Sequence, residues 1–140
     1  MRIVIGADEA RHVLAHIKSH LESKGHAADL LPIGTWGPVA VAVANEVAAG
    51  HATFGIVLCY SGTGVSIAAN KVAGVRAALC TDASTAQSAR KWNDANVLAL
   101  SLRSLSDTVA TEIVDAWLES TYTGTEGESL EAITKLETKQ

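Results

Sequence analysis

A cysteine stands where a buried apolar run gives way to a glycine-rich loop. Residues 59–66 read Cys-Tyr-Ser-Gly-Thr-Gly-Val-Ser and complete the apolar run 54–59. Glycines let successive backbone N–H groups point into one site, and the start of a following helix adds to their positive potential. Such a loop is suited to bind a phosphate, or an oxyanion that forms during a reaction.

The thiol of Cys59 has two interpretations from its position alone. A neighbouring anion site stabilises a thiolate, which can act as a nucleophile or as a general base. Cys59 can equally be a small residue of the hydrophobic core. The loop lacks the lysine of a nucleotide phosphate-binding loop, and the first strand, which ends at Gly6-Ala7-Asp8-Glu9, does not match the dinucleotide-binding fingerprint.

Short apolar runs alternate with helical patterns along the chain. The patterns predict strands over 3–5, 27–31, 54–59, 75–80 and 97–100, and helices over 10–23, 38–49, 66–71, 84–92, 106–118 and 130–136. This alternation predicts one domain over 1–140, an α/β protein with a three-layer α/β/α, Rossmann-like fold and a five-stranded parallel sheet. Ligands of such folds bind at the carboxyl ends of the strands. The loops that begin at Gly6, Cys59, Thr81 and Ser101 are therefore expected to converge.

Composition narrows the classes of function. The chain has 140 residues, is 48% apolar and carries a net charge of −4, which suits a domain with a real core and argues against nucleic acid as a partner. The only cysteines, Cys59 and Cys80, have no zinc-type spacing, so we expect reduced thiols in the cytoplasm and no metal. No apolar run is long enough to span a bilayer, so no membrane partner is expected.

Three histidines form a second pattern. His12, His16 and His20 recur every four residues and share one face of a predicted helix. The simplest interpretation is a solvated or interface face, and the alternative is a metal site.

A longer pattern surrounds the cysteine loop. It runs Gly55-Ile56-Val57-Leu58-Cys59-x-Ser61-Gly62-x-Gly64-x-Ser66-Ile67-Ala68-Ala69-Asn70-Lys71 and continues through 74–77, 86–90, 93–99, Arg103 and 113–118, while Gly6-x-Asp8 stands near the start. Together these segments resemble the ribose-5-phosphate isomerase B and galactose-6-phosphate isomerase family over nearly the whole chain. Another branch of that family has a carboxylate base at the position of Val65, so this chain resembles the branch that uses a cysteine.

The resemblance implies an aldose–ketose isomerase that acts on a phosphorylated sugar through a cis-enediolate, without a cofactor. Cys59 and Ser61 would be the catalytic residues, with Cys59 as the base. The residues implied to bind substrate are Asp8, Glu9, Gly62, Thr63, Gly64, Val65, Ser66, Trp92, Asn93 and Arg103. Within this set the loop would hold the enediolate oxygen, Asp8 a hydroxyl and Arg103 the phosphate. The family assembles as homodimers or homotetramers with shared sites, which implies that the tail over about 121–140 packs on a partner subunit.

The chain departs from the family pattern at four places. Glu9 and Trp92 each replace a histidine, and the one replaced by Trp92 opens the sugar ring. Gly37-Pro38 takes the place of an Asp-Tyr-Pro segment, and the C-terminal arginines that grip the phosphate are absent. We therefore expect a short or open-chain sugar phosphate as substrate, with His12 the one candidate for a substitute acid.

Other interpretations remain open at this point. The missing histidine and arginines also fit a non-catalytic sugar-phosphate-binding or regulatory module on the same fold. An epimerase or a lyase could use the same enediolate. Trp36 and Trp117 are expected in the core or at a dimer contact.

Overall fold

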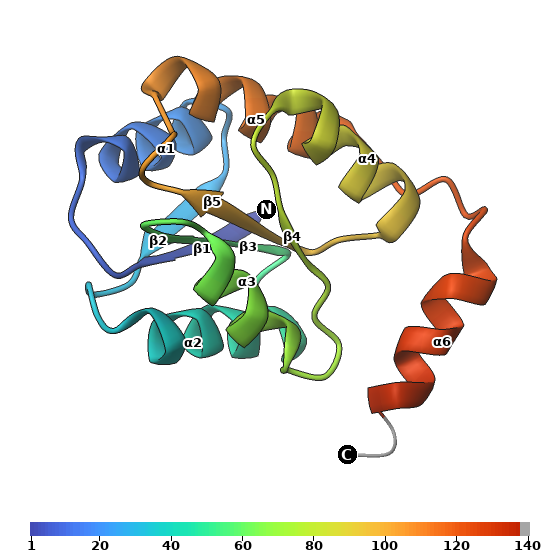
Figure 1. Cartoon of the computed structure of the whole chain (residues 1–140). Coiled ribbons are helices and arrows are strands. Elements are labelled where there is room, and N and C mark those ends of the chain that lie inside the picture. The colour runs from blue at the N-terminus through green and yellow to red at the C-terminus, as the bar shows by residue number, and fades with distance from the viewer. Residues whose placement is uncertain (138–140) are drawn as a thin grey trace.

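Five parallel strands form one sheet at the centre of the computed structural model, which describes residues 1–137 (Figure 1). The strands are β1 (Arg2–Ala7), β2 (Ala27–Leu30), β3 (Phe54–Cys59), β4 (Ala77–Leu79) and β5 (Val97–Ser101). Their order across the sheet is β2-β1-β3-β5-β4, and every neighbouring pair is parallel. The predicted fold class is therefore confirmed.

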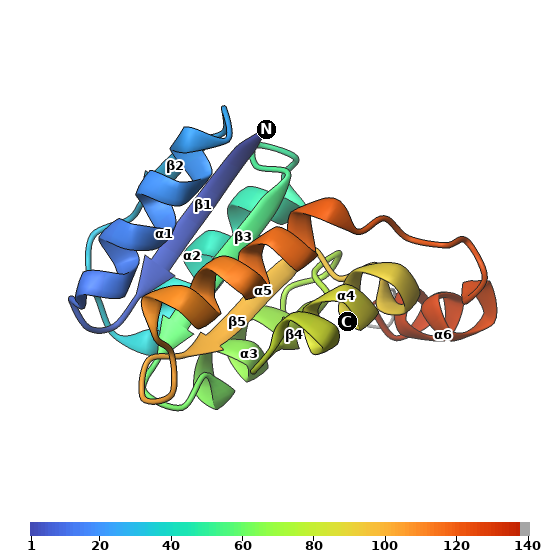
Figure 2. The same cartoon turned by 90° about the horizontal axis from the view of Figure 1, so that it is seen from above.

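Helices cover both faces of this sheet (Figures 1 and 2). One layer holds α1 (His12–Ser23), α4 (Ala83–Asn93) and α5 (Asp107–Glu119), and the other holds α2 (Trp36–Ala48) and α3 (Thr63–Asn70). A last helix, α6 (Gly127–Glu137), lies apart from both layers. No helix within residues 1–137 combines the length and the apolar character needed to cross a membrane.

The alternation of side chains along each strand decides which core a residue enters. Ile56 and Leu58 of β3 pack in the core beneath α1, α4 and α5, whereas Val57 and Cys59 pack in the core beneath α2 and α3. Successive residues of a strand point to opposite faces, and a parallel sheet covered on both sides buries both sets. The alternation of side chains along β3 therefore directs Cys59 toward the face that is covered by α2 and α3.

Several element boundaries differ from the predicted ones. Helix α2 begins at Trp36, two residues before Pro38, and α3 begins at Thr63, three residues before Ser66. Asp82 alone provides the side-chain cap of α4, where its Oδ1 accepts a hydrogen bond from the Thr85 amide at 2.7 Å. The loop after Cys59 is consequently shorter than expected, and the start of α3 lies directly beside the thiol.

The histidine stripe joins two helices within the chain. His16 Nε2 lies 2.8 Å from Thr111 Oγ1, His20 Nε2 lies 2.7 Å from Asp115 Oδ1, and His12 Nδ1 lies 3.0 Å from Asp107 Oδ2. In residues 1–137 no group of three or more histidine, cysteine or acidic side chains is placed to hold a metal ion. His16 and His20 thus lie between α1 and α5, whereas the side chain of His12 is 82% exposed and pairs with Asp107 at the surface.

The contact between α1 and α5 leads to a pH-dependent prediction. Burial raises the pKa of Asp115, but hydrogen bonds from His20 and Lys24 lower it more, so its pKa lies below the ordinary value. A carboxylate whose pKa is lower in the folded than in the unfolded protein stabilises the fold at pH values above its unfolded pKa. This stabilisation is lost as the pH falls through the pKa of the folded protein. We expect Asp115→Asn to lower the free energy of unfolding by about 0.5–1 kcal/mol at pH 7.

Urea unfolding at several pH values measures this effect. The difference between Asp115→Asn and the wild type should shrink as the pH falls below about 4, where the carboxylates become protonated. Glu112→Gln on the same helix is the control, because Glu112 is exposed and has no ion pair within residues 1–137. A loss for Asp115→Asn that is equal at neutral and acid pH would contradict the electrostatic origin.

Candidate active site

The candidate site lies where the order of the strands reverses direction. From β1 the chain moves outward to β2 and then returns to the other side of β1 as β3. Crevices at such switch points, beyond the carboxyl ends of the strands, are the usual ligand sites of open α/β sheets. Here the two strand ends lead directly into Asp8 and Cys59, and the Asp8 amide donates to the Leu58 carbonyl at 3.3 Å.

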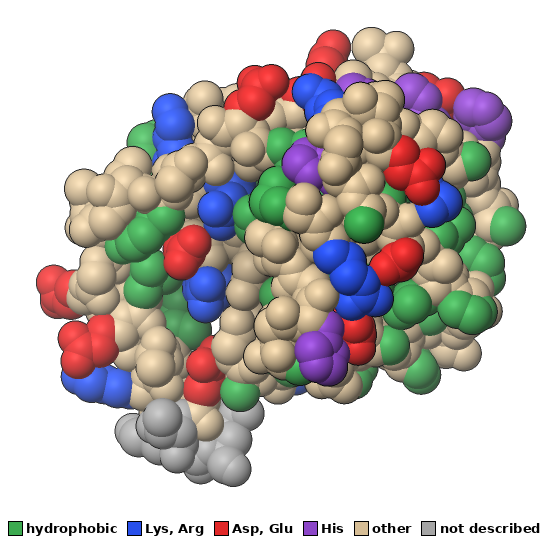
Figure 3. All heavy atoms as spheres, turned by 180° about the vertical axis from the view of Figure 1, so that it is seen from behind, with side chains coloured by type: hydrophobic (Ala, Val, Ile, Leu, Met, Phe, Trp, Pro, Cys, Tyr) green, Lys and Arg blue, Asp and Glu red, His purple; other side chains and the backbone are tan. Residues whose placement is uncertain are grey.

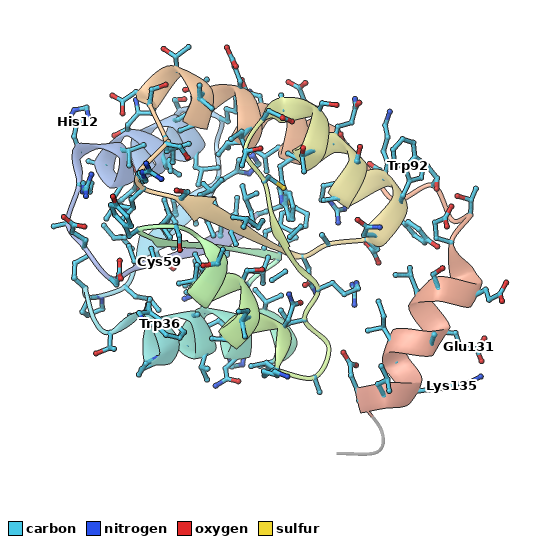
Figure 4. All side chains as sticks on the ribbon, in the orientation of Figure 1. His12, Trp36, Cys59, Trp92, Glu131 and Lys135 are labelled. Atoms are coloured by element: carbon cyan, nitrogen blue, oxygen red, sulfur yellow. The ribbon has the colours of Figure 1, made fainter. Side chains whose placement is uncertain are left out.

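A hollow of about 270 Å³ opens at this point. Its walls are formed by Asp8, Trp36, Cys59, Tyr60, Ser61, Thr63 and Gly64. Figure 4 shows Cys59 and Trp36 at the same end of the sheet, on β3 and at the start of α2. Cys59 is 5% exposed, so its thiol lies at the floor of the hollow with the rest of the residue in the core.

The start of α3 lines the hollow beside the thiol. Gly62 is the N-cap with a φ of 77°, and an added Cβ there would lie 2.6 Å from Leu79 Cδ1 and 2.9 Å from the Leu100 backbone carbon. Only glycine fits both the dihedral angle and the space. Gly62 therefore brings the start of α3 against β5. The N–H groups of Thr63, Gly64 and Val65 lie in the first turn of this helix, where N–H groups have no acceptor within the helix.

The same helix start is electrostatically suited to an anion. The first turn of α3 contains no acidic side chain, and no side chain caps it by a hydrogen bond. Unpaired N–H groups and the helix dipole therefore leave a positive potential at this end of α3. A developing oxyanion or a phosphate at this position would accept hydrogen bonds from these N–H groups.

Backbone hydrogen bonds hold the loop rigid. The Leu102 amide donates to the Cys59 carbonyl at 2.9 Å, and the Arg103 amide donates to the Tyr60 carbonyl at 3.0 Å. Ser101 Oγ also donates to the Tyr60 carbonyl at 2.9 Å, and the Ser61 and Thr63 hydroxyls lie 2.7 Å apart. The end of β5 therefore fixes the position of the thiol relative to the hydroxyl pair.

Asp8 faces the thiol from the neighbouring strand. Its Oδ1 is buried and has no hydrogen-bond partner in residues 1–137. An ionised carboxylate can only accept hydrogen bonds, and a buried acceptor without a donor costs free energy. Asp8 is accordingly suited to a ligand that carries hydroxyl groups.

The second cysteine has a different environment. Burial raises the pKa of Cys80 to about 12, with a further contribution from the charge of Asp82. Its Sγ lies 3.7 Å from the Ala78 carbonyl on the face of the sheet opposite Cys59. Cys80 therefore remains a neutral thiol at neutral pH, and Cys59 is the cysteine with access to a hollow.

The comparisons agree with this geometry. The Ribose/Galactose Isomerase family model matches residues 3–136. The chain belongs to the ribose/galactose isomerase family. Ribose-5-phosphate isomerase B of Escherichia coli strain K12 is 39% identical, with 99% of this chain and 98% of that protein covered. D-Erythrulose-4-phosphate isomerase of Pectobacterium atrosepticum is 40% identical, with 89% and 86% covered.

A solved structure supports the same assignment. Ribose-5-phosphate isomerase B from Mycoplasma genitalium, with bound ribulose-5-phosphate, superposes with a TM-score of 0.94. It is 32% identical, and the superposition covers 99% of this chain and 97% of that one. The family resemblance deduced from the cysteine loop is thereby confirmed, and the chain is a member of a family of sugar-phosphate isomerases.

In this family member, some predicted site residues lie outside the Cys59 hollow. Val65 is fully buried and only its backbone faces the helix start, while the Ser66 amide donates to the Gly62 carbonyl at 3.2 Å. Glu9 pairs with Arg11 at 3.1 Å, and the side chain of Arg103 is exposed beside the loop. His12, offered as a substitute acid, is not among the residues that form the walls of the hollow.

Trp92 and Asn93 lie at the other end of the molecule. They line a groove of about 490 Å³ between α6 and the body of the chain, together with Lys71, Arg76 and Ile133 among others. Figure 4 places Trp92 beside α6, far across the sheet from Cys59, and Figure 3 shows the groove as a hollow beside α6. Although this groove is larger than the Cys59 hollow, it has no thiol or histidine in its walls. A single chain does not bring these two residues to Cys59.

Two wall residues were missed by sequence reasoning. Trp36, which was expected in the core or at a dimer contact, is 46% exposed and lines the hollow, whereas Trp117 is 2% exposed and belongs to the core as expected. Tyr60 follows Cys59 and is 57% exposed. The available signal for Trp36 was a large aromatic residue in a glycine- and proline-rich loop at the carboxyl end of a strand.

Gly64 allows a test of the contact that shapes the hollow. Its backbone does not have a positive φ, so alanine there should favour the helix. However, an added Cβ would lie 2.9 Å from Trp36 Cε3, so the ring must move. We expect Gly64→Ala to lower the free energy of unfolding by about 1 kcal/mol in the wild type.

The same substitution should be neutral or stabilising when Trp36→Ala is also present, because the steric conflict is gone. Urea unfolding of the four chains gives the coupling between the two positions. Gly127→Ala is the matched control, since nothing lies within 4 Å of an added Cβ at that helical glycine. Equal effects of Gly64→Ala in both backgrounds would exclude the contact.

Proposed function

We propose that this chain is an aldose–ketose isomerase that acts on a short or open-chain phosphorylated sugar, with Cys59 as the proton-transferring base. The observation that supports it is the meeting of three groups in one hollow: the Cys59 thiol, the start of α3 and Asp8. Enediolate chemistry needs a base next to a site that stabilises an oxyanion. The thiol and the unpaired N–H groups of α3 meet both needs.

The proposed steps conserve every proton and electron. The Cys59 thiolate removes a proton from the carbon beside the carbonyl group, and the electrons of that C–H bond form a C=C bond. The carbonyl oxygen becomes an enediolate oxygen, which accepts hydrogen bonds from the start of α3. The Cys59 thiol then returns its proton to the neighbouring carbon, while a proton moves between the two substrate oxygens. The Ser61 hydroxyl, which is hydrogen-bonded to that of Thr63, is placed to relay this second proton.

A substrate of four carbons fits the side chains that are present. The indole of Trp92 cannot act as an acid or base, so a mechanism without ring opening suits this chain. A tetrulose phosphate has no stable ring and needs no such step. The similarity to a protein named D-erythrulose-4-phosphate isomerase supports this choice, and the neighbour with bound ribulose-5-phosphate supports the wider class of sugar phosphates.

The proposal includes a homodimer, or a homotetramer built from dimers, in the cytoplasm. Helix α6 has no buried residue, and its Ile133 and Leu136 are 41% and 63% exposed. An amphipathic helix gains most of its stability from packing its apolar side, so α6 and the groove beside it are suited to a second copy of the chain. In such a dimer Trp92 and Asn93 of one subunit would complete the Cys59 hollow of the other.

Deuterium exchange tests the catalytic proposal. In D₂O the wild type should exchange a C1 proton of erythrulose 4-phosphate faster than one of ribulose 5-phosphate or of a hexulose phosphate, as followed by NMR. Cys59→Ala and Cys59→Ser should lower the rate at least about a hundredfold, because a positioned base is lost. Cys80→Ala is the control and should retain the rate, since the pKa of Cys80 is about 12 and its thiol is neutral.

Each other outcome has a defined meaning. A clear preference for the pentulose would reject the short-chain substrate, and full exchange in Cys59→Ala would reject the base. Binding without exchange for every sugar would leave the non-catalytic module. The NMR spectra also identify the product, so an epimer or a cleaved sugar would indicate an epimerase or a lyase.

Mixed dimers test the shared site. Cys59→Ala and Asn93→Ala should each be strongly impaired as pure proteins. If the two are unfolded and refolded together, half of the dimers should be mixed and each should contain one intact site, so activity should return to about a quarter of the wild type. Sedimentation of the same samples reports the assembly state. A monomeric wild type, or a mixture no more active than its parents, would contradict the shared site.

A further inference from the structure

We infer that Trp36 sets the length of the sugar that this enzyme accepts. The inference rests on the isomerase function proposed above and adds a residue to its specificity. It concerns a side chain that stands beside the oxyanion site rather than one that takes part in proton transfer.

The Trp36 ring lies directly on the start of α3. An added Cβ at Gly64 would lie 2.9 Å from Trp36 Cε3 and 3.1 Å from both Cδ2 and Cζ3, so the six-membered part of the indole covers the Gly64 Cα. Gly64 is one of the residues whose N–H groups are free at the start of α3. The ring therefore forms the wall next to the place where an enediolate oxygen would bind.

The backbone that carries Trp36 is fixed on both sides. Before it, the Gly34 amide donates to the Ala7 carbonyl of β1 at 3.3 Å, and after it the Val39 amide donates to the Thr35 carbonyl at 3.1 Å. Trp36 is thus the first residue of α2 and is held between the end of β1 and the start of that helix. The Cα that carries the ring therefore cannot withdraw without moving α2.

The exposure of the ring fits a sugar as the occupant of the hollow. Trp36 is 46% exposed, although tryptophan is on average highly buried, and it lines the same small hollow as Asp8, Ser61 and Thr63. An apolar ring together with a few polar groups is the usual lining for a small polar ligand. A carbon chain can lie on the indole while its hydroxyl groups reach the polar side.

A bulky ring beside the reacting carbons limits how much chain can extend past them. Pockets discriminate substrates that differ by one carbon by about tenfold to a hundredfold. Trp36 accordingly favours a four-carbon over a five-carbon sugar phosphate, which gives a structural basis for a short substrate that is independent of the missing histidine.

Steady-state kinetics of substitutions at position 36 test this role. The measured quantity is the ratio of kcat/KM for erythrulose 4-phosphate to that for ribulose 5-phosphate. Trp36→Ala should lower this ratio about tenfold or more, and Trp36→Phe, which keeps a smaller ring on Gly64, should lower it less. Ile33→Ala is the matched control, because Ile33 lies in the loop just before Trp36, is 45% exposed and is not part of the hollow.

A binding measurement separates this inference from the proposed function. Calorimetry with phosphorylated four- and five-carbon aldonates, whose carboxylate resembles the enediolate, gives the corresponding ratio of binding affinities without catalysis. If the wild type isomerises neither sugar, the proposed function fails, and the aldonate ratio still decides the role of Trp36. A ratio that changes by less than about twofold in both Trp36 variants, or equally in Ile33→Ala, overturns the inference. If Trp36→Ala does not fold, Trp36→Phe decides.

Discussion

The close approach of Gly62 to β4 and β5 is the contact on which the site depends. An added Cβ would lie within 3.0 Å of Leu79 Cδ1 and of the carbon and oxygen of the Leu100 carbonyl, so the chain can turn into α3 here only as glycine. This turn lets α3 begin at Thr63, only four residues after Cys59, so the first N–H groups of the helix lie close to the loop that carries the thiol. The distance between the thiol and the proposed oxyanion site is therefore set by backbone packing in the core, where the protein is close-packed.

The rest of the sheet supports this turn. The parity of β3 sends Cys59 to the face covered by α2 and α3, and the Leu102 and Arg103 amides hold the Cys59 and Tyr60 carbonyls from β5. The switch of strand order between β1 and β3 leaves the crevice that Asp8 and Cys59 share. The proposed base thus stands on a strand end and the walls stand on loops, so a change of walls would alter substrate preference without disturbing the thiol.

Much of this could be predicted from the sequence because it follows from periodicity and local motifs. The apolar runs indicated all five strands, and the cysteine loop with its flanking segments indicated the family. The positions of Trp36 and of Trp92 could not be predicted, since both depend on where a helix begins or ends relative to a distant part of the chain. Pro38 suggested a helix start two residues too late. Trp36 was therefore placed in a loop, and the direction of its side chain could not be predicted. Val65 was predicted to bind substrate, but only its backbone lies in the first turn of α3, and its side chain is buried in the core.

Charged side chains surround both the Cys59 hollow and the groove beside α6. Glu126 lines the groove beside α6, Arg11 is paired with Glu9 near the mouth of the Cys59 hollow, and Arg103 is exposed beside the loop. Within residues 1–137, neither Arg103 nor the first N–H groups of α3 are paired with an acidic side chain. A helix start binds a phosphate or an oxyanion without a flexible cation, at a smaller cost in side-chain entropy than several ordered arginines. Glu9 and Trp92 in place of histidines, together with the missing C-terminal arginines, fit the proposed short substrate, which would be selected more by the shape of the walls than by charge.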